Sequence, residues 1–182
     1  MGLFDLFKKK KVACNFSKLD VASPRPYEEP TERQLSYARD LGIIFPNDVS
    51  KDDISCLISR ANGDDHNEAP APDMVELALK LGVNFSPYVS SDRLLRIIFY
   101  DCTDAQKGAL YTYAVYQRNV GRQFSNMFDE PHIDTFIEIG EHIASDKELC
   151  DLLNDRPVDD LASPRKGTKI YNAVSELLNN RL

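Results

Sequence analysis

The residues that come closest to a catalytic or metal-binding arrangement lie in one short stretch of this chain. Glu138 and His142 are one helical turn apart, and Glu141, His132 and Asp134 are close to them in sequence. Carboxylates and imidazoles at such spacing can ligate a metal ion or exchange protons. A dimetal site in a helical bundle, however, uses Glu-x-x-His facing inward, whereas this group is Glu-x-x-x-His and lies opposite the apolar stripe. We interpret it as a solvated helix face and expect neither a metal nor a cofactor.

The sequence lacks the short motifs of common enzyme classes. It contains no G-x-S-x-G, G-x-x-x-x-G-K-[ST], G-x-G-x-x-G or H-E-x-x-H, and its eight glycines do not cluster. The four cysteines are scattered without a C-x-x-C pair: Cys14, Cys56, Cys102 and Cys150. We therefore expect a protein that is not an enzyme.

The strongest pattern is an internal repeat. Residues 31–60 match residues 71–100 without a gap at an offset of forty positions, with Leu-Gly, Phe and Val-Ser in register. A self-match at a fixed period determines the architecture before any other signal. In the first copy, the capping box Thr31-x-x-Gln34 and a serine, Ser50, predict two helix starts, and Pro46 predicts an extended connection. Each copy is thus expected to form a helix, an extended loop and a second helix.

The remaining sequence also predicts helices, so we expect an all-α fold with tandem helix–extended loop–helix repeats followed by a small helical bundle. Apolar stripes predict helices from Thr103 to about Val120, over 131–145, and over 169–178, with a short one between the last two. Tyr111, Tyr113 and Tyr116, beside Arg118 and Arg122, could form a base-stacking surface, but we expect these tyrosines to be core and boundary residues. The expected segments are a basic tail and linker (1–30), the first repeat (31–62), an acidic linker (63–70), the second repeat (71–101) and a helical region (102–182).

The two copies resemble SAP-like and HeH (helix–extended loop–helix) modules, on Gly42-Ile43 followed by a loop and Lys51-x-Asp53-Ile54-x-x-Leu57-Ile58. Similar segments occur in bacterial and phage proteins, some of which process DNA. The resemblance implies binding of DNA, RNA or protein, with basic residues of the second helix and its loop used for nucleic acid. Those basic residues are here Lys51, Arg60, Arg93 and Arg96.

The charge distribution argues for a protein partner rather than a nucleic acid. The net charge is −7, and copy two has Ser91 where copy one has Lys51. A body this acidic repels a phosphate backbone, which proteins recognise mainly through Lys and Arg. Our leading hypothesis is a non-catalytic protein that binds another protein, associated with a phage or mobile element. The alternative is a nucleic-acid accessory factor that uses the repeats.

A third hypothesis is peripheral membrane attachment through residues 1–11. An apolar patch is followed there by a lysine block, which suits an anionic lipid surface: Leu3, Phe4, Phe7, Lys8, Lys9, Lys10 and Lys11. No apolar run approaches the length of a membrane span, and the order of charge and apolar residues is wrong for a secretory signal. The cytoplasm is the expected compartment, with the membrane surface as the alternative.

The loop between Gly121 and Pro131 carries three more apolar side chains, Phe124, Met127 and Phe128. They are expected either to fold under onto the core or to form an exposed docking patch.

Overall fold

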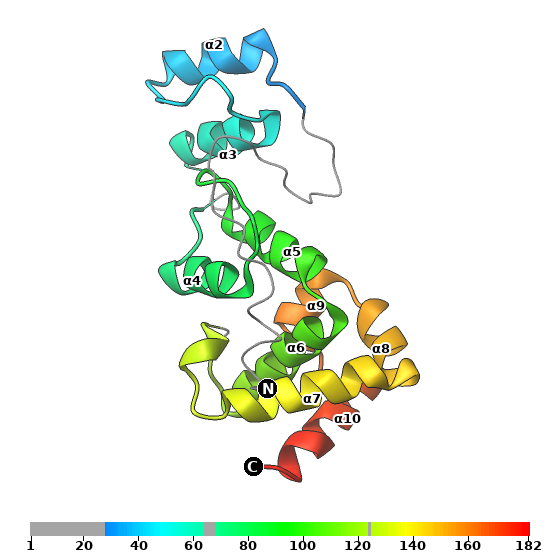
Figure 1. Cartoon of the computed structure of the whole chain (residues 1–182). Coiled ribbons are helices and arrows are strands. Elements are labelled where there is room, and N and C mark those ends of the chain that lie inside the picture. Colours follow the sequence, from blue (N-terminus) through cyan, green and yellow to red (C-terminus); the bar gives the residue numbers. More distant parts are fainter. Residues whose placement is uncertain (1–27, 64–67, 124) are drawn as a thin grey trace. The chain divides into compact units, whose positions relative to one another are not determined.

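A computed structural model describes residues 28–63, 68–123 and 125–182 (Figure 1). These residues form α-helices and one short 3-10 helix without any strand, which confirms the all-α expectation for the part of the chain described. The elements in chain order are α2 (Glu32–Asp40), α3 (Lys51–Ala61), α4 (Pro72–Leu81), α5 (Ser91–Asp101), α6 (Asp104–Asn119), η2 (Met127–Asp129), α7 (Ile133–Ser145), α8 (Lys147–Asn154), α9 (Val158–Ala162) and α10 (Lys169–Asn179). None of the described helices is both long and apolar enough to cross a bilayer.

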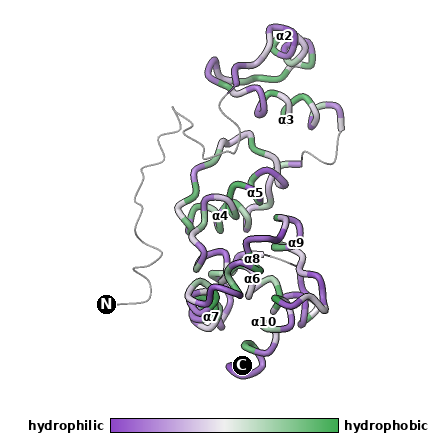
Figure 2. The backbone as a smooth tube through the Cα atoms, turned by 90° about the vertical axis from the view of Figure 1, so that its right-hand side faces the viewer, coloured by the Kyte–Doolittle hydropathy of each residue, from purple (hydrophilic) through white to green (hydrophobic). Residues whose placement is uncertain are grey.

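The chain divides into two compact units that adjoin in sequence between Tyr100 and Asp101. We call the part before this boundary the N-terminal unit and the part after it the C-terminal unit. Along the helices, hydrophobic and hydrophilic residues alternate, as Figure 2 shows for α3 and α5. Helices such as α3 and α5 therefore bury one face and expose the other.

The N-terminal unit contains two helix pairs whose backbones match at the offset of forty residues. The N–H of Ile43 donates to the carbonyl of Ala38 at 3.0 Å, and the N–H of Val83 donates to Ala78 at 3.0 Å. Gly42 has φ +72° and Gly82 has φ +73°, so glycine supplies a left-handed turn after α2 and after α4. The same backbone path therefore leaves the first helix of each pair.

The correspondence also extends before the region that the sequence match covers. The N–H of Lys51 donates to the carbonyl of Glu28 at 2.9 Å, and the N–H of Ser91 donates to the carbonyl of Glu68 at 2.9 Å. In both pairs, then, the residue that begins the second helix is tied to a glutamate before the first helix. Each helix pair therefore begins three residues before the matched segments 31–60 and 71–100, at Glu28 and at Glu68.

Helix caps were predicted correctly at some helices and wrongly at others. The capping boxes at Thr31 and Thr103 are confirmed, and the Ser50 hydroxyl accepts from the N–H of Asp53. In the second copy, Asp73-x-x-Glu76 predicts a cap at Asp73, which is wrong: the N-cap residue is Ala71, and α4 begins at Pro72, whose missing N–H suits the first turn. Ser145-x-x-Glu148 also predicts a cap at Ser145, which is wrong, since this residue ends α7 and Asp146 caps α8 instead.

The two helix pairs are joined by contacts that cross from one copy to the other. The ring of Tyr88, in the loop of copy two, packs on the core of copy one formed by Ala38, Val49 and Ile54. The Arg60 guanidinium of α3 donates to the carbonyl of Tyr88 at 3.1 Å and to that of Val89. The loop of copy two thus closes the core of copy one.

The C-terminal unit is built around α6, which packs against α7, α8, α9 and α10. Residues 108–115 of α6 are all buried, Tyr111 and Tyr113 among them, so this helix is surrounded by the others. The Tyr113 hydroxyl is bonded to Ser125 at 2.7 Å and accepts from the Gln117 amide at 2.7 Å. The two tyrosines are therefore core residues, as expected.

In the C-terminal unit, α6 and α7 cross closely at two glycines. A Cβ on Gly140 would lie 2.4 Å from the carbonyl oxygen of Ala105 and 2.5 Å from the nitrogen of Ala109. A Cβ on Gly108 would lie 2.9 Å from the Cα of Gly140. The two backbones meet directly at this point, which requires glycine on both helices.

Candidate functional site

The four basic residues of the predicted nucleic-acid surface are held within the protein rather than presented together. Arg93 forms an ion pair with Asp52, with an N–O distance of 2.6 Å, and Lys51 forms one with Glu28. Arg60 donates to two backbone carbonyls of copy two, and Arg96 lies exposed on α5, where it also has an interaction. At least three of these cations therefore have a role in holding the N-terminal unit together.

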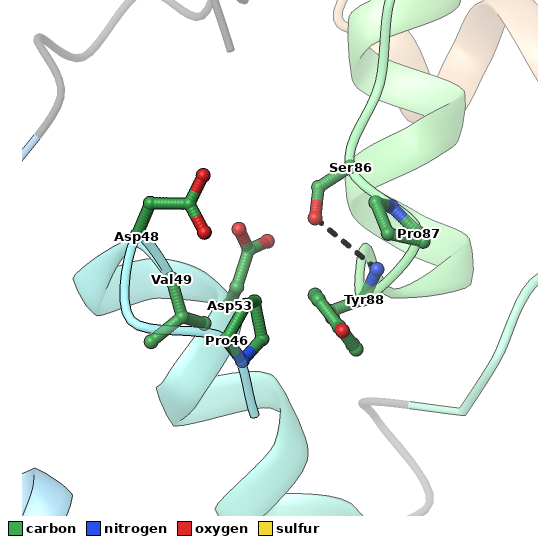
Figure 3. A pocket seen from close by; sticks show the side chains of 7 residues that line it. All are labelled: Pro46, Asp48, Val49, Asp53, Ser86, Pro87 and Tyr88. Carbon is green, nitrogen blue, oxygen red and sulfur yellow. Dashed lines mark hydrogen bonds between the residues drawn. The ribbon is translucent and has the colours of Figure 1, made fainter. Parts of the chain in front are cut away.

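A pocket lies between the loop of copy one and the loop of copy two (Figure 3). Its volume is about 240 Å³, and we call it the loop pocket. It is lined by Pro46, Asp48, Val49, Asp53, Ser86, Pro87 and Tyr88. Positions 46 and 86, and likewise 48 and 88, are forty residues apart, so equivalent loop positions face each other across it.

The carboxylates of the loop pocket lie on the copy-one side. In Figure 3, Asp48 and Asp53 lie on this side, and Ser86 and Tyr88 on the other. The Asp53 side chain is only 2% exposed, and one of its oxygens accepts from the Ser50 hydroxyl at 2.7 Å. Over the described ranges 28–63, 68–123 and 125–182, neither carboxylate forms an ion pair with a lysine or arginine. The loop pocket is therefore apolar on several walls and negatively charged on one side.

A second concave surface lies between α2 and α3 of copy one. This groove has a volume of about 750 Å³, and we call it the α2–α3 groove. It is lined by Thr31, Arg33, Gln34, Ser36, Tyr37, Asp40, Ser55, Ile58 and Ser59. Its floor is stabilised by a hydrogen bond from the Gln34 amide to the Ser55 hydroxyl at 3.0 Å.

The equivalent surface of copy two is covered. Tyr37 is 46% exposed, whereas Leu77, forty residues later, is 0% exposed. Ile58 is half-buried, whereas Ile98 is fully buried. At these two positions, copy one leaves its side chain more exposed to solvent than copy two does.

The acidic and histidine residues of α7 do not converge on a metal site. Glu138 is exposed and forms an ion pair with Arg181 at 3.4 Å, and His142 is also exposed. Among the residues that the structure describes, no group of three or more His, Cys, Asp or Glu is arranged to hold a metal ion.

Four side chains of the C-terminal unit, Cys102, Cys150, Tyr111 and Tyr113, have pKa values raised above their ordinary values. Burial raises the pKa of the Cys102 thiol to about 12, and the nearby Asp101 carboxylate adds to this rise. Burial likewise raises the pKa of Cys150, together with the neighbouring Asp104, and the pKa of Tyr111 and of Tyr113. A nucleophilic cysteine requires a lowered thiol pKa, which these two residues do not have.

The sequence also predicts a docking patch in the 121–131 loop and a membrane tail at residues 1–11. Met127 is fully buried, so the alternative in which the 121–131 loop folds onto the core holds for this residue. Phe128 is half-buried and Phe124 lies outside the described residues. The membrane tail of residues 1–11 also lies outside them, and lipid attachment stays a prediction.

Sequence reasoning missed the loop pocket and the role of Tyr88. The only signal was the offset of forty, which makes positions 48 and 88 equivalent but does not show that they face each other. Compared with family models, with curated proteins and with solved structures, this chain has no match.

Proposed function

We propose that this chain is a non-catalytic helical protein that binds another protein, and that residues 31–60 and 71–100 are tandem SAP-like helix–extended loop–helix modules. The observation that carries the proposal is the difference between the two copies. At Tyr37 and Ile58, copy one leaves open a groove whose equivalent in copy two is filled or covered, at Leu77 and Ile98. Tyrosine is enriched in protein interfaces because it offers a large apolar ring with a polar tip.

The basic residues of the N-terminal unit favour protein binding over nucleic-acid binding, because they already contact groups of the same chain. Lys51 and Arg93 already neutralise carboxylates of the same chain, and Arg60 holds the loop of copy two. A phosphate backbone would have to compete with these contacts, and the chain has a net charge of −7.

Site-specific photocrosslinking tests the proposal. A benzophenone amino acid is placed at Tyr37, and in a matched control at Leu79, which is 51% exposed on α4. In extracts of the native host, position 37 is expected to give a discrete protein adduct that position 79 does not give. Unlabelled protein should compete for it, and the Tyr37→Ala variant should compete poorly. Identical adducts at both positions, or none at position 37, would refute the proposal.

The nucleic-acid alternative predicts a different result for an Asp52 variant than the protein-binding proposal does. If Arg93 contacts phosphates, Asp52→Asn should release this cation and strengthen retention on DNA or RNA at low salt. If Arg93 serves only the fold, the substitution changes stability and leaves retention at background.

A further inference from the structure

The loop pocket contains two carboxylates that form no ion pair with a lysine or arginine in the described part of the chain. Asp53 is almost completely buried and Asp48 lies beside it at the pocket (Figure 3). The Ser50 hydroxyl and the first-turn position in α3 help to stabilise Asp53, but they supply no cation. Arg93 is paired with Asp52, and the Arg60 guanidinium donates to the backbone carbonyls of Tyr88 and Val89. A carboxylate taken out of water without a cation is an unfavourable arrangement that a basic ligand would relieve.

The other walls of the loop pocket suit an aliphatic chain. Pro46 and Val49 come from copy one, and Pro87 and Tyr88 come from copy two. Lysine and arginine pack their methylene stems along apolar surfaces while their charged heads reach a polar group. Apolar walls that lead to carboxylates match a long basic side chain in both shape and charge.

We propose that the loop pocket receives an arginine or lysine side chain of the partner protein. This inference rests on the proposed function only in taking the partner to be a protein. The carboxylates exclude a phosphate or another anion from the same space. A metal ion is not favoured, because no set of three ligating residues is present among the described ones.

The loop pocket also accounts for why copy one and copy two differ at equivalent positions. Asp53 of copy one corresponds to Arg93 of copy two, and Asp48 corresponds to Tyr88. Arg93 is used within the unit, and Tyr88 is used to close the core of copy one. The carboxylates on the other side are left to face the pocket.

Titration with capped amino acids tests the proposal on the full chain. The probes are N-acetyl-arginine methylamide and N-acetyl-lysine methylamide, with N-acetyl-norleucine methylamide as the neutral control. Binding is followed by 1H–15N NMR. We expect saturable shifts of the backbone amides of Val49, Asp53 and Tyr88 with the two basic probes, and none with norleucine. No saturable shift up to about 50 mM of either basic probe, or equal shifts with norleucine, would overturn the proposal.

Charge-neutral variants complete the test. Asp48→Asn combined with Asp53→Asn is expected to weaken binding of the basic probes by about tenfold. The matched control, Asp73→Asn with Asp92→Asn, changes the net charge equally on exposed helix positions and should bind as the wild type does. Equal affinity in the pocket variant and the wild type would contradict the proposal. Asp48→Asn alone, on an exposed loop residue, gives the same test if the double variant unfolds.

The failures of the two proposals can be distinguished. Titrations that behave as expected, with no adduct at position 37, would overturn the proposed function and leave a pocket for basic side chains. A specific adduct at position 37 with a null titration would overturn the pocket alone.

Discussion

The crossing of α6 and α7 gives the sharpest prediction, because the sign of the effect separates two explanations for a glycine in a helix. In an exposed helix, Gly140→Ala should stabilise the protein by about 1 kcal/mol, since alanine has the higher helix propensity. At this crossing, however, the new Cβ would lie 2.4 Å from a backbone oxygen of α6 and 2.5 Å from a backbone nitrogen. Neither atom can rotate away as a side chain could. The variant should therefore be less stable.

The magnitude follows from the distances. Ordinary contact begins at 3.4 Å, so the two helices must separate by about 1 Å locally, which loosens the packing of Phe136 and Ile143, both fully buried on α7. Overpacking of this kind costs about 1–3 kcal/mol, and we expect a net loss near the middle of that range, about 2 kcal/mol. For a unit of this size, such a loss lowers Tm by about 8–16 °C.

The assay is thermal and urea unfolding followed by circular dichroism, with hydrogen exchange to locate the effect. Amides of α6 and α7 should exchange faster in the variant, whereas those of α2 and α3 should not. Asn172→Ala, at an exposed position of α10, is the control and should change stability by less than about 0.5 kcal/mol. If Gly140→Ala raises the free energy of unfolding, the close backbone approach is wrong.

Further predictions concern the cross-copy contacts, the buried thiol and a helix cap. Arg60→Met should destabilise the N-terminal unit by about 2 kcal/mol in urea unfolding, because the buried carbonyl of Val89 loses a charge-assisted donor; an unchanged midpoint would contradict this. Cys102 should react with iodoacetamide at about pH 8 far more slowly in the folded protein than in urea, measured by mass spectrometry. Because its folded pKa of about 12 exceeds the ordinary value of 9.0, its contribution to stability is complete below pH 9.0 and is lost as pH rises from there toward 12; a stability that rises over this window would reverse the sign. Thr103→Ala should cost about 1 kcal/mol through the lost capping box of α6, measured against Thr135→Ala in the interior of α7.

The helices themselves were predictable because their signals are local. The capping boxes at Thr31 and Thr103 depend on residues three positions apart, and the apolar stripe of α7 depends on a regular spacing. The two wrongly predicted caps, at Asp73 and Ser145, also have local causes. Because Pro72 begins α4, Asp73 lies inside the first turn of that helix and does not cap it. Asp146, next to Ser145 in the sequence, caps α8.

Burial was less predictable than helix position, since it depends on what surrounds a helix. The apolar pattern of the helix that starts at Thr103 also predicts a buried Val120, but this residue lies beyond the last turn of α6 and is exposed. In contrast, Thr112 is fully buried, and its hydroxyl donates to the carbonyl of Gly108 at 2.8 Å. The short helix α9 gave no periodic signal, because its residues Val158–Ala162 span little more than one turn.

The candidate site was not predictable from residue type, because the same residue types serve the fold and a ligand equally well. Arginines on the second helix of a repeat suggested phosphate contacts, yet Arg60 and Arg93 each hold one copy to the other. The positions that the copies share, such as Gly42 and Gly82, set the backbone path and carry no ligand information.

The positions where the copies differ therefore carry the functional information. If the two copies were identical, equivalent loop positions would place like residues opposite one another. A carboxylate at position 93 could then not form the ion pair that Arg93 forms with Asp52. In this chain copy two has Arg93 at that position and Tyr88 opposite Asp48, so the copies join through a base and an aromatic ring. Among the described residues, the same exchange leaves Asp48 and Asp53 without an ion pair to a lysine or arginine. The differences between the copies thus have two effects: they join copy one to copy two, and they leave carboxylates at the pocket between the two loops. Variants that separate these effects must change Asp48 and Asp53 and keep Arg93 and Tyr88.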